Sequence, residues 1–366
     1  MSDEAYMERA IGLAEEGRGL VSPNPMVGAL VVTDGVVVGQ GWHEGPGEPH
    51  AEVIALREAG RRARGATLYI SLEPCNHFGR TPPCTDAIIE AGLARVVSAL
   101  GDPNPLVDGR GYARLRDAGL EVTEDVLEGP ASHLNRAFVK HVSTGRPFVV
   151  WKAAASLDGK VAARDGSSRW VTSEAARADV HRIRAWADAI VVGAGTALAD
   201  DPSLTVRESG YRGRPPLRVV VDARGRVPAT GRLFDRDAPT LVASTPAAPG
   251  ARRADWANAG AEVELFEPTR DGGVPLDALA EHLGKRDVQG LLLEGGPTLA
   301  WAAIDAGVVD EIVLYLAPKL VGGAGAPSVL GGEGFAPIGD ALGLSMRSVE
   351  RIGEDLKVVG SVHRDR

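Results

Sequence analysis

The chain has 366 residues, which is enough for about two domains with a hydrophobic core in each. An apolar fraction of 44% and a charged fraction of 24% are ordinary for a globular protein and exclude a disordered or fibrous chain. The net charge of -9, without a clustered basic segment, argues against binding of nucleic acid, because neutralising phosphates requires a basic face.

The N-terminal segment 1–17 shows the pattern of an acidic amphipathic helix, not a basic region followed by an apolar core. We therefore expect no signal peptide. No apolar run approaches the roughly 18 residues of a membrane span, so we expect no membrane association. The only two cysteines, Cys75 and Cys84, belong to one motif, which predicts a reducing, cytoplasmic setting.

The first half of the chain alternates between strands and helices. After the first helix, a turn-rich segment leads into a predicted hairpin with strands at 29–32 and 36–38. The elements expected next are a helix from His50 to about Ala59, a strand at 67–72, a helix at about 84–91, a strand at 95–99, a helix at 109–118 and a strand at 120–122. This order predicts an α/β sandwich around one sheet.

One motif in this half carries the chemistry of a catalytic metal site. His50, Cys75 and Cys84 offer one imidazole and two thiolates, which are three ligands for zinc and leave a fourth position for water. A structural zinc site would normally have four protein ligands. Glu52 can move protons for that water. Residues two apart on a regular helix point to nearly opposite sides, so His50 and Glu52 converge only at a helix start.

Cys84 should also open a helix, and the N-terminal ends of helices favour thiolate over thiol. Each part of the motif occurs by chance in many proteins. The combination matches the zinc deaminase signature, H-x-E followed by P-C-x-x-C, except for a longer spacer before the second cysteine.

The spacer 76–83, together with Pro23-Asn24-Pro25-x-Val27-Gly28 and segment 101–105, resembles the deaminase half of the bifunctional riboflavin-biosynthesis deaminase/reductases, whose spacer is this long. The resemblance implies a cytidine-deaminase-like α/β/α sandwich. It also implies hydrolytic deamination of 2,5-diamino-6-(5-phosphoribosylamino)pyrimidin-4(3H)-one, in which Glu52 takes a proton from water and passes it to departing ammonia.

The residues that the resemblance assigns to substrate binding in this half are Asn24, His77, Arg80, Asp102 and Asn104. Arg80 and His77 would reach the phosphate, and the other three would hold the ring and ribose. Turn formation is an equally good explanation for Asn and Asp beside Pro. As a fourth zinc ligand, His77 would close the site and leave Glu52 without a water to act on.

A break in the pattern at 143–147 predicts two domains, 1–145 and 146–366. In the second, we expect a strand from Phe148, a helix at 174–187, and strands at 189–192, 217–221, 240–243 and 291–293. Gly193-x-Gly195 lacks the third glycine of a dinucleotide-binding motif, because Leu198 stands in its place. Segment 294–298 is a better phosphate site, since its glycines precede a helix with free N–H groups.

Segments 152–159 and 168–170, the expected loop 193–200, and segment 294–298 resemble the reductase half of the same family in the same order, so the resemblance covers nearly the whole chain. It implies a dihydrofolate-reductase-like α/β domain that binds NADPH. A hydride would reduce the ribosyl arm at C1′ and give 5-amino-6-(5-phosphoribitylamino)uracil.

The positions expected to face NADPH are Ala154, Trp170, Thr196, Asp200, Asp222, Gly296, Pro297, Thr298 and Leu299. Those expected to face the substrate are Ser168, Arg184, Leu204, Arg207 and Glu294, and the two arginines suit its phosphate. Lys152 and Asp200 are candidates for proton transfer, although either could instead be an orienting charge.

We interpret segment 230–280 as scaffold. Segments 311–316, 318–319 and 356–359 are expected to be edge strands that pair across a homodimer or higher homo-oligomer.

Two other functions of the protein stay open. The first is a deaminase of nucleosides or RNA bases with an accessory nucleotide-binding domain, which the lack of a basic surface disfavours. The second is a zinc-stabilised interaction protein, which the presence of Glu52 disfavours.

Overall fold

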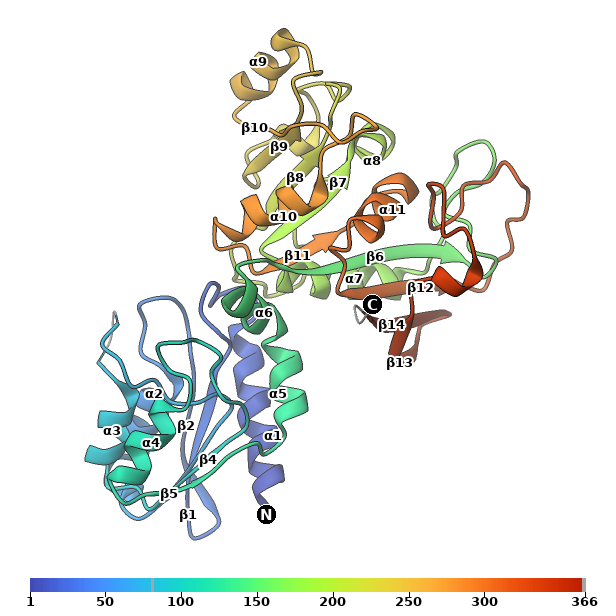
Figure 1. Cartoon of the computed structure of the whole chain (residues 1–366). Helices are drawn as coiled ribbons and strands as arrows, with labels where there is room; N and C mark the ends of the chain where they lie inside the picture. Colours follow the sequence, from blue (N-terminus) through green and yellow to red (C-terminus); the bar gives the residue numbers. More distant parts are fainter. Residues whose placement is uncertain (80–81, 364–366) are drawn as a thin grey trace. The chain divides into compact units, whose positions relative to one another are not determined.

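A computed structural model describes residues 1–79 and 82–363 (Figure 1). The chain divides into two units, Met1–Gly145 and Arg146–Arg366, here called the first and second units. Among the described residues, every helix is too short or too polar to cross a membrane.

The first unit contains a five-stranded sheet in the order β2-β1-β3-β4-β5. The antiparallel part comprises β2 (Val36–Trp42), β1 (Gly28–Thr33) and β3 (Thr67–Ile70). The parallel part continues from β3 through β4 (Arg95–Ser98) to β5 (Glu121–Thr123). The hairpin and the alternation that the sequence predicts are thereby confirmed.

Helices cover both faces of this sheet (Figure 1). One face carries α2 (Ala51–Ala59), α3 (Cys84–Glu90) and α4 (Arg110–Asp117), and the other carries α1 (Asp3–Ala14), α5 (Glu128–Leu134) and α6 (Arg136–Thr144). Single turns of 3₁₀ helix, Glu15–Gly17 and Gly60–Ala63, follow α1 and α2. The predicted α/β sandwich is confirmed, whereas α5 and α6 were not predicted.

The alternation of side chains along β3 shows why both faces need helices. Leu68 and Ile70 pack into the core beneath α2, α3 and α4, whereas Tyr69 lies in the core on the α1 side. Helix α2 lies directly on β2, because a Cβ at Gly39 would be 2.1 Å from the Ala55 carbonyl oxygen. This close packing fixes the position of the N-terminal end of α2, where the candidate metal site begins.

The second unit contains a nine-stranded sheet in the order β10-β9-β8-β7-β11-β6-β12-β14-β13. Its strands are β6 (Phe148–Ser156), β7 (Ala189–Gly193), β8 (Leu217–Val221), β9 (Thr240–Ser244), β10 (Glu262–Leu265), β11 (Gly290–Leu293), β12 (Glu311–Ala317), β13 (Leu344–Ile352) and β14 (Asp355–Val362). The strands from β10 to β12 are parallel, and β14 and β13 continue the sheet antiparallel.

Helices α10 (Leu276–Gly284) and α11 (Pro297–Asp305) cover one face of this sheet, where they pack on Val149, Leu291 and Leu293. Helix α7 (Glu174–Trp186) contacts the opposite face through polar side chains. The remaining helices are α8 (Ala194–Asp200), α9 (Gly250–Asn258) and the 3₁₀ turns Arg232–Phe234 and Ile338–Asp340. The α/β class predicted for this half is confirmed.

Two predictions for the second unit are wrong. Segment 193–200, expected to be a loop, forms α8 after its first residue, because the alanines that surround Gly195 favour helix and Gly193 serves as the N-cap. The strands at 311–316 and 356–359 are not edges: β12 lies between β6 and β14, and β14 lies between β12 and β13. The edge strands are β10 and β13, and the mixture of charged and apolar residues in β13 gave no clear strand pattern. Segment 318–319, also expected to be an edge strand, follows β12 and is not a strand.

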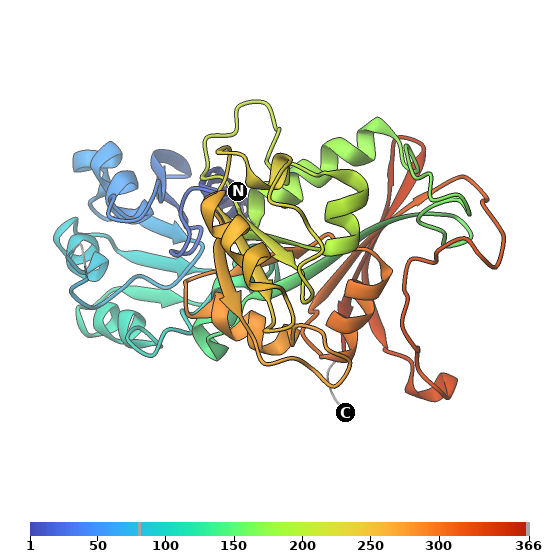
Figure 2. The ribbon, with the colours of Figure 1, turned by 90° about the horizontal axis from the view of Figure 1, so that it is seen from above.

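Two long loops extend side by side from the carboxyl ends of β6 and β12 (Figures 1 and 2). They comprise residues 157–173 and 318–343. The Asp158 carboxylate accepts hydrogen bonds from the backbone N–H groups of Val321 and Gly322. The Lys319 ammonium donates in return to the carbonyl oxygens of Trp170 and Val171. Charged side chains therefore fasten the loops to each other in both directions.

Candidate functional site

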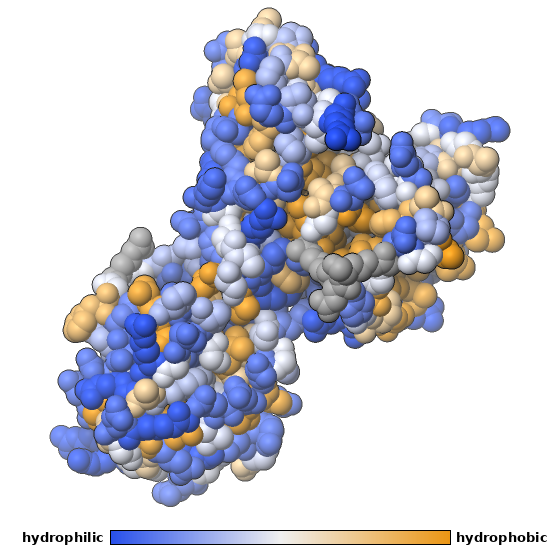
Figure 3. Space-filling view, viewed as in Figure 1, coloured by the Kyte–Doolittle hydropathy of each residue, from blue (hydrophilic) through white to orange (hydrophobic). Residues whose placement is uncertain are grey.

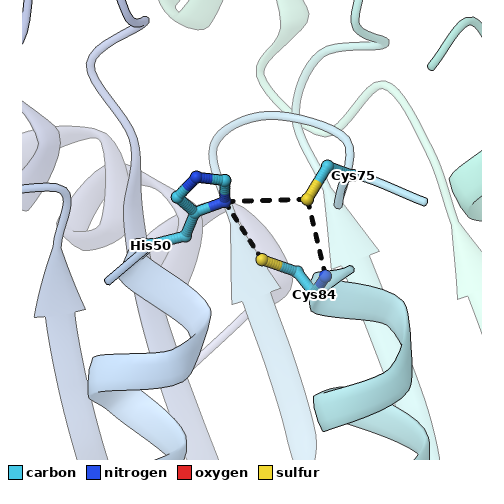
Figure 4. Close-up of side chains that lie close together, drawn as sticks. All are labelled: His50, Cys75 and Cys84. Carbon is cyan, nitrogen blue, oxygen red and sulfur yellow. Dashed lines mark hydrogen bonds between the residues drawn. The ribbon is translucent and has the colours of Figure 1, made fainter. Parts of the chain in front are cut away.

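Three potential metal ligands meet in the first unit at the N-terminal ends of two helices (Figure 4). His50 directly precedes α2, Cys84 is the first residue of α3, and Cys75 lies in the connection after β3. Their ligand atoms all lie within 4.8 Å of one another. His50 Nδ1 is 3.1 Å from Cys84 Sγ and 3.6 Å from Cys75 Sγ. One ion at about 2.0–2.3 Å from each atom would fit this triangle.

The ligand set suits zinc with an open coordination position. Within the part of the chain that the structure describes, the metal-binding group contains only these three residues, so His77 is not part of it. The Cys84 side chain and the His50 ring lower the pKa of the Cys75 thiol. The backbone N–H of Cys84 also donates to Cys75 Sγ at 3.4 Å. Thiolate, the form that binds metal, is thus favoured at Cys75.

Glu52 lies in the first turn of α2 and is only 3% exposed. Burial raises the pKa of its carboxyl group. Among the described residues its Oε2 atom is buried and has no hydrogen-bond partner. Since buried polar atoms normally have partners, an unpaired oxygen beside a metal triad points to a ligand or water in the functional state. A carboxyl with a raised pKa is suited to general acid–base catalysis.

His43, which sequence analysis missed, lies in the same site. Its ring centroid is 5.3 Å from that of His50, and its side chain is 3% exposed. His43 Nε2 lies 2.9 Å from Asn24 Nδ2, and Nδ1 lies 3.2 Å from the Pro49 carbonyl oxygen. The Asn24 amide therefore donates to Nε2, and Nδ1–H donates to Pro49. Its place in the loop just before His50 was the only available signal.

Asp102 and Asn104 both make the turns that were the alternative explanation for them. Asp102 Oδ1 accepts the Asn104 N–H at 2.9 Å, and Asn104 Oδ1 accepts the Leu106 N–H at 3.1 Å. Burial raises the pKa of Asp102 to about 6, and the charges of Glu73, His77 and Cys75 also act on it. Asp102 is therefore near the metal triad as well as part of a turn.

The spacer loop contains the other two predicted substrate ligands. His77 Nδ1 is buried and, among the described residues, has no hydrogen-bond partner. Arg80, the predicted phosphate ligand, lies outside the described residues. Phe78 is 80% exposed and contributes no polar group.

In the second unit, a buried carboxylate lies between two cations. The Glu294 carboxylate follows β11 and contacts the Lys152 ammonium at 3.0 Å and the Arg184 guanidinium at 2.6 and 3.0 Å. Burial alone would raise the pKa of Glu294, but Arg184 and Lys152 outweigh burial and hold this pKa well below its usual range. Strand β6, helix α7 and the end of β11 thus bring three predicted site residues together.

A second group of predicted residues meets where β7 and β11 end. The Gly296 N–H donates to Thr196 Oγ1 at 3.1 Å, which ties the start of α8 to the start of α11. Among the residues that the structure describes, no side chain caps α11, and Pro297 occupies its first turn with Thr298 and Leu299. In parallel sheets, ligands bind outside the carboxyl ends of the strands, and the free N–H groups of a helix start favour anions.

The remaining predicted residues lie in varied settings. Trp170 is 64% exposed, and the Arg177 guanidinium lies over its ring, 4.3 Å from the ring centroid. Ser168 lies in the same loop, 157–173. Ala154 lies on β6 beside Tyr315 of β12. Asp200 ends α8 and is exposed.

Two predicted site residues, Leu204 and Asp222, have structural roles within the second unit. Leu204 is buried, with 1% of its surface exposed. The Asp222 carboxylate accepts the backbone N–H groups of Arg224 and Val227, so it stabilises its own turn.

His181 is a second site residue that sequence analysis missed. Its Nδ1 accepts the backbone N–H of Arg207, a predicted phosphate ligand, at 3.1 Å. Burial and the charges of Arg184 and Arg207 lower the pKa of His181 to about 4, so the ring is neutral near pH 7. The only hint in the sequence was its position three residues before Arg184, on the same side of a helix.

Comparisons with known proteins cover both units. Residues 1–100 match the family model of the cytidine and deoxycytidylate deaminase zinc-binding region, and residues 147–358 match that of the RibD C-terminal domain. The riboflavin biosynthesis protein RibD of Escherichia coli is 42% identical over 374 residues, covering 99% of this chain and all of that protein. RibD of Bacillus amyloliquefaciens is 43% identical, covering 97% of this chain and 95% of that protein.

Two solved structures are also similar to this chain over nearly its whole length. Acinetobacter baumannii RibD is 38% identical with a TM-score of 0.88, and 99% of each chain is covered. A Thermotoga maritima protein is 35% identical with a TM-score of 0.87, again over 99% of each chain. It is described as a diaminohydroxyphosphoribosylaminopyrimidine deaminase and 5-amino-6-(5-phosphoribosylamino)uracil reductase.

Proposed function

The chain belongs to the RibD family of riboflavin-biosynthesis deaminase/reductases, and we propose that its first unit deaminates a phosphoribosylaminopyrimidine that its second unit then reduces. The observation that carries this proposal is the open set of three metal ligands beside the unpaired Oε2 of Glu52. A hydrolytic deaminase needs both an activated water and a group that moves its proton.

In the first unit, His50, Cys75 and Cys84 would hold Zn²⁺, which when bound supplies the Lewis acidity that activates water. Glu52 would accept a proton at Oε2 and return it to the departing amine. Burial raises the pKa of Glu52, which supports this role because the carboxyl then holds a proton more readily than an exposed one does.

Substrate binding in the first unit would fall to residues around the triad. Asn24 is oriented by its contact with His43, and Asp102 lies near enough to feel the charge of Cys75. His77, Arg80 and Asn104 complete the proposed set. The order of events implied is deamination of 2,5-diamino-6-(5-phosphoribosylamino)pyrimidin-4(3H)-one before reduction of its ribosyl arm.

In the second unit, NADPH would supply the hydride. The uncapped start of α11 and the Thr196–Gly296 contact favour its phosphates there. Trp170, on the fastened loop, would face the cofactor. Arg184, Arg207 and Ser168 would hold the phosphorylated substrate, and Lys152 Nζ would donate the proton that balances the hydride.

We also propose that the second unit forms a homodimer. Its outer strand β13 exposes Met346 and Val349, which are 56% and 61% exposed. Figure 3 shows apolar residues interspersed with polar ones in this part of the unit. An unpaired edge strand with apolar side chains is a site for pairing with another chain. Sedimentation of wild type and of Val349→Glu would test this, and a monomeric wild type would overturn it.

The proposed function is tested with zinc-loaded full-length protein by measuring ammonia release and NADPH absorbance separately. With the diaminopyrimidine we expect ammonia followed by NADPH consumption, and with the deaminated compound NADPH consumption alone. Chelation of zinc should stop the first reaction and leave the second. Ammonia release from cytidine or RNA, but not from the pyrimidine, would favour the alternative deaminase instead.

A further inference from the structure

Glu73 is a buried carboxylate to which the reaction above gives no role. It lies two residues before Cys75 and is 4% exposed. Its backbone N–H donates to the Leu100 carbonyl oxygen at 2.8 Å. The end of β3 is thereby joined to the end of β4, where the loop with Asp102 and Asn104 begins.

Four backbone N–H groups donate to the Glu73 carboxylate. Gly111 and Tyr112 donate to Oε1 at 2.9 and 3.4 Å, and Gly109 and Asp102 donate to Oε2 at 3.0 and 3.3 Å. All four groups belong to segment 102–112, which runs from the predicted substrate loop into the first turn of α4. Hydrogen bonds to a charged acceptor are stronger than neutral ones, so one side chain organises the whole segment.

Segment 102–112 packs closely against the residues around Glu73. A Cβ at Gly111 would lie 2.1 Å from the Pro74 carbonyl oxygen and 3.0 Å from Glu73 Oε1. No side chain can therefore separate the start of α4 from the residues that lead to Cys75. Residues Glu73 and Pro74 therefore lie directly against segment 102–112.

We propose that Glu73 is a positioning residue for deamination, which fixes the loop of Asp102 and Asn104 relative to the metal ligand Cys75. This inference rests on the proposed function of the first unit. A carboxylate is needed because both oxygens face donors, and glutamine would turn an NH₂ group toward N–H groups. Aspartate keeps the charge but is one methylene too short to reach the same donors.

The test uses zinc-loaded, full-length Glu73→Gln. We expect kcat/KM for ammonia release to fall roughly 10- to 100-fold, with a raised KM, because small displacements of binding groups cost about that much. Bound zinc and NADPH consumption with the deaminated compound should stay at wild-type levels. Hydrogen exchange of amides 102–112 should become faster. Glu8→Gln, an exposed carboxylate on α1, is the matched control and should change nothing.

Several outcomes would overturn the inference: wild-type KM and kcat, a loss of activity that matches lost zinc, or unchanged exchange of amides 102–112. If Glu73→Gln does not fold, Glu73→Asp decides, since positioning predicts a raised KM with full zinc content. If wild-type protein releases no ammonia, the proposed function fails, and the exchange measurement still tests the attachment of the segment by itself.

Discussion

The two sites are built in opposite ways. In the first unit, one short stretch from His50 to Cys84 supplies the metal ligands, and two helix starts place them. In the second unit, residues far apart in the sequence meet at Glu294, which follows β11 and contacts β6 and α7. The first site therefore depends on local structure and metal, and the second on the packing of the whole sheet. Substitutions should affect them separately.

The largest effect should come from Glu52→Gln. Loss of general acid–base catalysis should reduce ammonia release by about 10²- to 10⁴-fold. Zinc content should be unchanged, because Glu52 is not one of the three grouped ligands. NADPH consumption with the deaminated compound should also persist. Glu48→Gln, an exposed carboxylate in the preceding loop, is the control. Ammonia release at the wild-type rate would refute the role of Glu52.

The second unit should be most sensitive at Glu294. Glu294→Gln leaves Lys152 and Arg184 buried without a counter-charge, which should lower its free energy of unfolding by about 3–5 kcal/mol. Tryptophan fluorescence during urea unfolding reports this unit, because all tryptophans except Trp42 lie in it. Ammonia release by the first unit should stay at the wild-type rate.

The matched control for Glu294 is Glu281→Gln. Glu281 pairs with Arg146 on the surface, with both side chains over 40% exposed, so the change should cost less than about 1 kcal/mol. Equal effects of the two substitutions would mean that the buried cluster adds nothing beyond an ordinary surface pair.

One site comes from a short stretch of sequence and the other from residues far apart, and this difference explains how far sequence alone could predict each site. His50, Glu52, Cys75 and Cys84 lie in one recognisable motif, and the helices that start there were predicted from local pattern. Their convergence required, in addition, only that α2 and α3 pack on the same face of the sheet. His43 and Glu73 were missed because their partners, Asn24 and segment 102–112, meet them only in the folded sheet.

In the second unit, the pattern indicated most strands but neither their order nor their neighbours. β11 lies between β6 and β7 although it follows them by about a hundred residues, so the contact of Lys152 with Glu294 could not be derived from spacing. For the same reason β12 and β14 were taken as edges. Assignments there came from the resemblance, and their individual roles stay predictions.

A smaller and more specific effect is expected from Arg207→Ala. Its side chain is exposed and available for a phosphate, and a charged hydrogen bond contributes about 1.5–3 kcal/mol. KM in the reductase step should therefore rise roughly 10- to 100-fold, as measured with the deaminated compound. Deamination should not change. Arg212→Ala, also exposed, serves as the control, and an equal loss in both steps would exclude a phosphate role confined to the second unit.

The smallest effect should be a pH dependence of the second unit that involves His181. Its pKa is lowered to about 4 in the folded protein, against about 6.5 for an unfolded chain. Between these values the unfolded chain binds a proton that the folded protein does not. The stability of the second unit should therefore decrease as the pH falls from about 6.5 to 4.

His181→Asn separates this titration from other acid effects, because asparagine does not titrate and its Oδ1 can still accept the Arg207 N–H. Urea midpoints from tryptophan fluorescence should match wild type at pH 7.5 and exceed it at pH 4.5. If the urea midpoint of His181→Asn falls with decreasing pH as steeply as that of wild type, the ring does not hold Arg207 by accepting its N–H. The construction of the reductase site would then rest on the contacts of Glu294 with Lys152 and Arg184, and His181 would have no part in holding Arg207.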